Sequence, residues 1–69
     1  MHGKLRLQLG AYLRRRRGDL TYAQFAKKLG LSSSTLHRLE LGEQNVTLET
    51  LETLLTKLNC RISDLFPDA

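Results

Sequence analysis

A serine and a histidine with the spacing of a nucleophile and its base occur in the stretch LSSSTLHRLE, residues 31–40. Ser33 and His37 would share one face of a helix, where the imidazole could accept the hydroxyl proton. Such a nucleophile also needs a group that orients the histidine and donors for the oxyanion, and none is evident in the sequence. A core of this size also has no room for a ligand-sized pocket. We therefore predict no enzyme, no catalytic residues and no small-molecule substrate.

Metal chemistry is disfavoured by the number and spacing of its ligands. His2, His37 and Cys60 lie far apart in the sequence and lack the spacing of a metal site. The sequence therefore predicts no metal and no cofactor. Cys60 is the single cysteine, so it forms no internal disulfide; we expect it to pack as a small apolar side chain where the last two helices join.

The charge is distributed unevenly along the chain. Residues 1–30 contain eight basic side chains and one acidic one, a net charge of +7, whereas residues 31–69 contain three and six, a net charge of −3. A strongly basic half suggests a polyanionic partner such as nucleic acid, and its alternative is a solvated basic helix. No apolar run approaches the roughly 20 residues of a membrane span, and no signal peptide is visible. We expect a cytoplasmic protein with no membrane partner.

The elements that would position these side chains are helices with clear starts and stops. Thr21, Ser32 and Thr47 are expected N-caps, each flanked by apolar residues five positions apart; Thr21 and Gln24 also form a capping box. Three glycines follow plausible last turns and suit the left-handed conformation: Gly18, Gly30 and Gly42. The apolar spacing, which includes Leu48 in the last long stripe, predicts helices at about 5–17, 22–29, 33–41 and 48–58, and a short one near 63–66 capped by Ser63. The fold class is therefore all-α, a compact domain of five short helices.

The second and third helices carry the pattern of a helix-turn-helix. Only Gly30, Leu31 and Ser32 join them, and such a short turn forces a steep crossing. Ala26 is small enough for close approach to the third helix, and Gly30 tolerates a positive φ. The side chains expected to close a small core between the two helices are Phe25, Leu29, Leu31, Leu36 and Leu39.

The runs LTYAQFAKKLGLSSSTLHRLELG and VTLETLETLLTKLNCRISDLF resemble the lambda-repressor-like, Cro-type helix-turn-helix family, also called the XRE family. The resemblance covers roughly residues 9–66. It divides the chain into an N-terminal arm and the start of the first helix (1–8), the helix-turn-helix DNA-binding domain (9–66) and a C-terminal tail (67–69). It implies sequence-specific binding to double-stranded DNA, usually by a homodimer that regulates transcription. A repressor-like protein would associate with the nucleoid when bound to DNA.

In the family, the N-terminal residues of the third helix contact base edges in the major groove. Carried over by position, the base-reading residues are Ser33, Ser34, His37 and Arg38. Arg38 is the strongest candidate, because a guanidinium can pair bidentately with guanine. Ser32 precedes the helix and is expected to cap it. The expected phosphate contacts are Tyr22, Thr35, Gln44, Asn45, Lys4, Arg6 and Arg14.

The remaining expectations concern residues that support the motif. Family members often pair an arginine late in the first helix with the glutamate that matches Glu40; Arg17 is our candidate, although an ungapped alignment would choose Arg15. The predicted structural residues of the motif are Thr21, Ala26, Gly30, Ser32, Leu36, Leu39, Glu40 and Arg17.

This sequence departs from the family pattern in several places. Tyr22 stands where glutamine is common, Ser33 where a longer amide is common, and Leu41 is apolar on the outward face. Glu43 would repel phosphate, and the link between the first two helices is about two residues short.

An alternative function uses the same fold to bind a protein, as the antitoxin of a toxin–antitoxin pair does. The acidic C-terminal half, with Leu65 and Phe66, could form that surface or a homodimer contact. These two side chains could instead close the core of their own chain, which we favour for Leu65 and leave open for Phe66.

Overall fold

The computed structural model describes residues 4–43 and 45–67, and its regular structure there is entirely helical. The elements are α1 (Lys4–Arg17), α2 (Tyr22–Leu29), α3 (Ser33–Leu41), α4 (Leu48–Leu58) and α5 (Ile62–Leu65). The all-α, five-helix prediction is confirmed, and the boundaries of α2, α3 and α4 are those predicted. Within the segment predicted as the arm and the start of the first helix (1–8), residues 4–8 belong to α1. Residues 1–3 and 68–69 lie outside the described residues.

The helix starts follow from the capping residues. The Thr21 hydroxyl accepts a hydrogen bond from the Gln24 backbone N–H at 3.1 Å, and the Gln24 side chain accepts one from the Thr21 N–H at 2.9 Å. The hydroxyls of Ser32 and Thr47 each accept from the N–H three residues later, both at 3.1 Å. These bonds satisfy donors that have no partner within a helix, so each helix has one favoured start.

The prediction for the last helix was wrong in its start. α5 begins at Ile62, so Ser63 lies inside it, and the residue before the helix is Arg61. The Asp64 carboxylate, in the first turn, accepts a hydrogen bond from the Arg61 backbone N–H at 2.9 Å, the bond that the third helical residue makes in a capping box. α4 is followed by Asn59, the one non-glycine residue with positive φ (52°) among the described residues. Asparagine tolerates this left-handed conformation, so it can close the helix.

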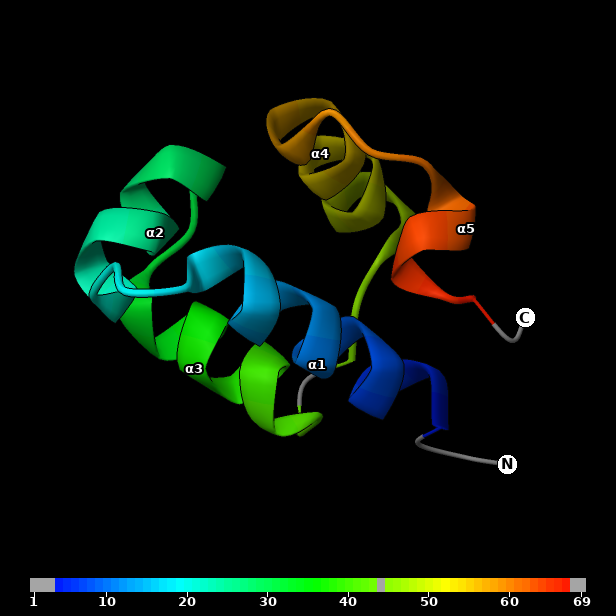
Figure 1. Cartoon of the computed structure of the whole chain (residues 1–69), viewed down its shortest axis with the longest axis horizontal. Coiled ribbons are helices and arrows are strands. Elements are labelled where there is room, and N and C mark those ends of the chain that lie inside the picture. Colours follow the sequence, from blue (N-terminus) through cyan, green and yellow to red (C-terminus); the bar gives the residue numbers. More distant parts are fainter. Residues whose placement is uncertain (1–3, 44, 68–69) are drawn as a thin grey trace.

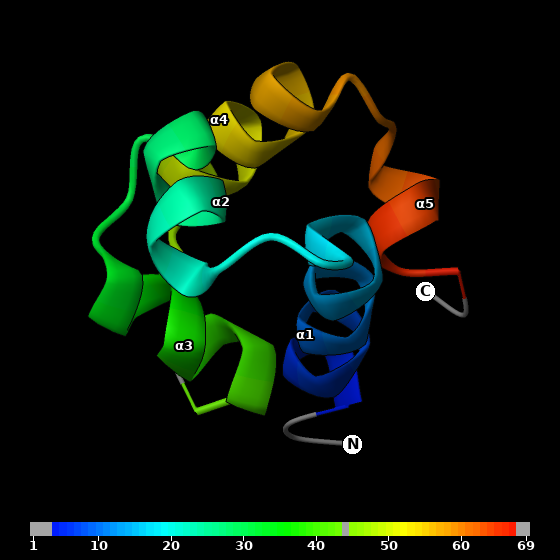
Figure 2. The same cartoon turned by 60° about the vertical axis from the view of Figure 1, so that its left-hand side comes forward.

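The core lies where all five helices meet. α1 packs against α3 and α5, and α2 packs against α3 and α4. Figures 1 and 2 show α1 running between the α2–α3 pair on one side and α5 on the other. The buried side chains of the core are Leu9, Leu13, Phe25, Ala26, Leu29, Leu36, Leu39, Leu54, Leu58 and Leu65.

Three apolar residues settle expectations from the sequence. Leu48 is 79% exposed, so its expected place in the apolar stripe of α4 was wrong: it is the first residue of the helix and extends beyond the core. Leu65 is fully buried, and Phe66 is partly buried against the same core. Both C-terminal side chains therefore close the core of their own chain. Cys60 is also half-buried against it.

Gly10 permits the close approach of α1 to α3. A Cβ at this position would lie 2.5 Å from the Glu40 carbonyl oxygen and 2.7 Å from that of Leu39. Backbone atoms cannot move aside as the end of a flexible side chain can, so a larger residue would separate the two helices.

We predict that Gly10→Ala destabilises the protein, by about 1–3 kcal/mol for overpacking of this kind. Helix propensity alone predicts the opposite sign, because alanine is favoured over glycine by about 0.5–1 kcal/mol within a helix. Urea unfolding measures the difference. Ala23→Gly, at an exposed position of α2, calibrates the propensity effect, and a Gly10→Ala variant more stable than the native chain would contradict the packing argument.

Candidate nucleic-acid interface

α3 has one buried side and one exposed polar side. Leu36, Leu39 and Glu40 are buried, and the predicted base-reading residues are all exposed: Ser33, Ser34, His37 and Arg38. Leu41 is 45% exposed at the end of the helix, as its outward position predicted. The fold therefore brings together on one exposed helix face two hydroxyls, an imidazole and a guanidinium, which are groups that can bond base edges.

The start of α3 is organised by the Ser32 hydroxyl. It accepts the Thr35 N–H, donates to the Thr35 hydroxyl at 2.8 Å and lies 3.3 Å from the Ser34 hydroxyl. Thr35 is half-buried, so part of its hydrogen-bonding capacity belongs to the cap. Ser33 and Ser34 remain exposed beside it.

The turn between α2 and α3 has the geometry that its residues suggested. Gly30 has φ 73°, and the Leu31 N–H bonds the Ala26 carbonyl at 2.9 Å, which closes the end of α2. Ala26 is only 2% exposed, which is consistent with a small residue under the crossing of the two helices. This turn sets the angle at which α2 supports α3.

A buried ion pair joins α1 to the last turn of α3. The Arg17 Nε and Nη2 donate to the two Glu40 carboxylate oxygens at 2.8 and 3.2 Å, and Arg17 Nη1 donates to the Leu20 carbonyl at 3.0 Å. Arg17 rather than Arg15 is therefore the partner of Glu40. The hydrogen bonds to Glu40 raise the pKa of Arg17.

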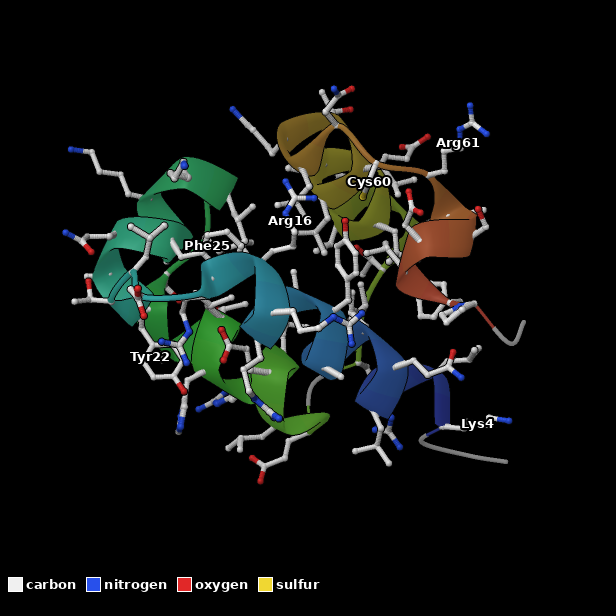
Figure 3. All side chains as sticks on the ribbon, viewed as in Figure 1. Lys4, Arg16, Tyr22, Phe25, Cys60 and Arg61 are labelled. Atoms are coloured by element: carbon white, nitrogen blue, oxygen red, sulfur yellow. The ribbon has the colours of Figure 1, made fainter. Side chains whose placement is uncertain are left out.

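The other arginines of the run have different surroundings. Arg14 Nη2 donates to the Glu40 carbonyl at 2.8 Å, so part of its guanidinium also holds the end of α3. Arg16 donates to the Tyr12 hydroxyl at 2.7 Å and to the Leu58 carbonyl at 3.2 Å. Burial raises the pKa of Tyr12, and contact with Cys60 adds to the shift while Arg16 opposes it. Figure 3 shows Arg16 and Cys60 on the α4 side of the molecule, well away from Tyr22.

Tyr22 makes two contacts that the sequence did not indicate. The Arg17 Cζ lies 4.2 Å from the centroid of the Tyr22 ring. The rings of Tyr22 and His37 lie 5.1 Å apart at an interplanar angle of 78°, an edge-to-face arrangement. The two aromatic residues are 15 positions apart on different helices, so no local pattern could reveal their contact.

The expected phosphate-contacting residues are spread over the molecule. Arg6 Nη1 donates to the Asn45 side-chain oxygen at 3.2 Å, so α1 and the segment after α3 meet there. Lys4 lies at the opposite end of the molecule from Tyr22 (Figure 3). Gln44 lies outside the described residues. Lys27 and Lys28, which were not among the expected contacts, are exposed in the last turn of α2.

Two further observations concern other kinds of site. Across residues 4–43 and 45–67, His, Cys, Asp and Glu side chains form no group of three that could hold a metal ion. In the same part of the chain, every helix is too short or too polar to cross a bilayer.

The short turn and the exposed polar face of α3 define a DNA-binding protein of the helix-turn-helix class. A family model described as a helix-turn-helix domain matches residues 8–63, and the chain belongs to this family. It is similar to the control protein C.MunI of Mycoplasma sp, with 34% identity over 56 residues that cover 81% of this chain and 76% of that protein. No solved structure gives a significant match. The expected resemblance to Cro-type regulators is confirmed: the protein is a DNA-binding transcriptional regulator.

We predict that Glu40→Ala chiefly lowers stability, because it removes the buried carboxylate that pairs with Arg17, while the backbone carbonyl that Arg14 bonds remains. Without the carboxylate, the Arg17 guanidinium loses its acidic partner, so the urea midpoint should fall clearly. Urea unfolding tests this, with the exposed neighbour Glu43→Ala as the matched control, expected within about 0.5 kcal/mol of the native chain. Full stability together with abolished DNA binding would place Glu40 in the interface instead of the core.

Proposed function

We propose that the protein recognises a specific operator in double-stranded DNA by inserting α3 into the major groove, and regulates transcription from there in a repressor-like manner. The observation that carries this proposal is the exposed face of α3. It offers Ser33, Ser34, His37 and Arg38 to solvent, while the opposite face is anchored by Leu36, Leu39 and the Glu40 ion pair. A helix held on one side and polar on the other can present base-reading groups in a fixed direction.

Within this surface, different residues have different tasks. Arg38 would pair bidentately with a guanine, and His37 and the two serines would bond neighbouring base edges. The phosphate contacts would come from Tyr22, Thr35, Gln44, Asn45, Lys4, Arg6 and Arg14. Two observations refine this set: Arg14 already holds the Glu40 carbonyl, and Arg6 and Asn45 support each other. Phosphate contacts would set the position of α3 on the duplex, and base contacts the sequence preference.

We also propose that the protein acts as a homodimer. A single short recognition helix reads few base pairs, and two copies would bind half-sites about 34 Å apart. The fold leaves Leu48 on α4 and Ile62 on α5 exposed, at 79% and 52%, and both helices lie outside the helix-turn-helix. Such apolar side chains would suit a contact between two copies. The regulator would act in the cytoplasm, associated with the nucleoid when DNA-bound.

The antitoxin-like alternative has less support. It rested on the acidic C-terminal half with Leu65 and Phe66, but Leu65 is fully buried and Phe66 packs on the core of its own chain. A protein partner would have to use other side chains. We therefore place operator binding first.

The first test is selection of bound fragments from a random duplex pool, followed by a salt titration with the best binder. We expect an enriched palindrome whose affinity falls steeply with rising salt, because bound phosphates release counterions. Weak binding without any enriched sequence, by a folded chain, would refute operator recognition. Sedimentation of the complex with a half-site and a full palindrome then tests the dimer, which requires two copies on the palindrome.

We predict that Arg38→Ala abolishes discrimination at one base-pair position, a loss of about 1–3 kcal/mol for a bidentate contact. The fold should be unchanged, because Arg38 is exposed and its neighbours Leu36 and Leu39 supply the packing. Binding to a panel of single-base operator variants measures the effect. An unaltered preference at every position would remove Arg38 from the base-reading set.

We predict a different response for Arg6→Ala. A phosphate contact contributes equally to every sequence, so the affinity should fall uniformly and the salt slope should decrease by about one unit. The matched control is Arg61→Ala, an exposed arginine just before α5 and outside the helix-turn-helix, at the upper right of Figure 3. A sequence-dependent loss in Arg6→Ala would show that the side chain reads bases instead.

A further inference from the structure

Tyr22 lies between a fixed cation and a base-reading candidate. One contact of its ring is the Arg17 guanidinium, at 4.2 Å, and the other is the His37 imidazole, at 5.1 Å. Tyr22 is half-buried, whereas His37 is exposed. The partly buried ring therefore forms the support against which the exposed imidazole rests.

The support is rigid because Arg17 is held at three points. Its guanidinium bonds both Glu40 carboxylate oxygens and the Leu20 carbonyl, and Glu40 is only 2% exposed. A planar guanidinium bound in this way cannot rotate without breaking several charge-assisted bonds. The Tyr22 ring thus packs on a surface fixed to the core.

The contacts form a closed circuit that begins and ends on the recognition helix. Glu40 of α3 binds Arg17 of α1, Arg17 packs on Tyr22 of α2, and Tyr22 contacts His37, which lies one turn before Glu40 on α3. An exposed histidine without such a neighbour would sample several rotamers and would lose that freedom on binding. Here its orientation is restricted before DNA arrives.

We propose that Tyr22 is a positioning residue for His37: its aromatic ring holds the imidazole in the direction from which His37 reads a base pair. This inference rests on the proposed operator recognition by α3. It gives Tyr22 a role in sequence preference, through its ring, that is separate from a phosphate contact through its hydroxyl. The two roles predict different results for variants that remove the ring or only the hydroxyl.

The test measures binding of each variant to the selected operator and to its single-base variants. Tyr22→Leu removes the ring and should lower discrimination at one base-pair position by about two- to tenfold, the range expected for loss of an aromatic pair. The affected position should be the one that His37→Ala affects. Tyr22→Phe keeps the ring and should retain the discrimination, while any loss of a phosphate contact lowers affinity for all sequences equally.

Further variants and a spectroscopic measurement separate positioning from a general effect on folding. In the Tyr22→Leu background, His37→Ala should cause no further loss of discrimination, because the two residues act as one unit. Tyr22→Gln is a second variant without the ring, for use if Tyr22→Leu unfolds. Thr56→Ala, at an exposed position of α4, is the control. In NMR spectra, the His37 ring protons should shift on loss of the ring and stay in place in Tyr22→Phe.

The outcomes distinguish this inference from the proposed function. A native chain without sequence preference would overturn both. Two outcomes would overturn only the positioning role, if the native chain does show a sequence preference. In the first, Tyr22→Leu or Tyr22→Gln lowers the affinity for all sequences equally. In the second, the ring-less variant loses discrimination at a base-pair position that His37→Ala leaves unchanged. The positioning role would also be overturned if the losses of discrimination caused by Tyr22→Leu and His37→Ala added up in the double variant.

Discussion

The Glu40 carboxylate is 2% exposed, and much of the structure depends on how its charge is compensated. A carboxylate withdrawn from water is tolerated only when it is paired and hydrogen-bonded. Arg17 meets this requirement with two hydrogen bonds. Because Arg17 is the last residue of α1, that helix must end beside the last turn of α3. Arg14 and Gly10 complete the contact: one bonds the Glu40 carbonyl, and the other lets the two backbones approach closely.

This contact explains how a basic first helix can serve both the fold and a nucleic-acid partner. Of the four consecutive arginines, Arg17 and Arg14 bind α3, and Arg16 bonds Tyr12 and the end of α4. The run that first suggested a polyanionic partner is therefore largely a set of bonds between helices. Glu40 compensates the charge of Arg17, whereas Arg14, Arg15 and Arg16 are exposed and keep their charge. Lys27, Lys28 and Arg38 add exposed charge on α2 and α3.

The anchoring of α3 also connects stability with recognition. Its buried side is held by apolar packing and the ion pair, and its exposed side presents the groups proposed to read bases. A recognition helix that moved relative to the rest of the domain would lose part of its binding free energy in ordering. The same guanidinium that compensates Glu40 supports Tyr22, and Tyr22 contacts His37. Folding and the proposed reading surface therefore share one set of contacts.

The sequence by itself determined the helices and the family, because caps, glycine stops and apolar spacing act over a few residues. Thr21, Ser32, Gly30 and Gly42 mark their ends in the structure as they do in the sequence. Local signals placed the start of α5 at Ser63, although the helix begins at Ile62. They also could not show that Leu48 extends beyond the core. The family resemblance offered Arg17 or Arg15 as the partner of Glu40. Only the tertiary structure decided for Arg17 and set Tyr22 against His37, because these contacts depend on the crossing of whole helices.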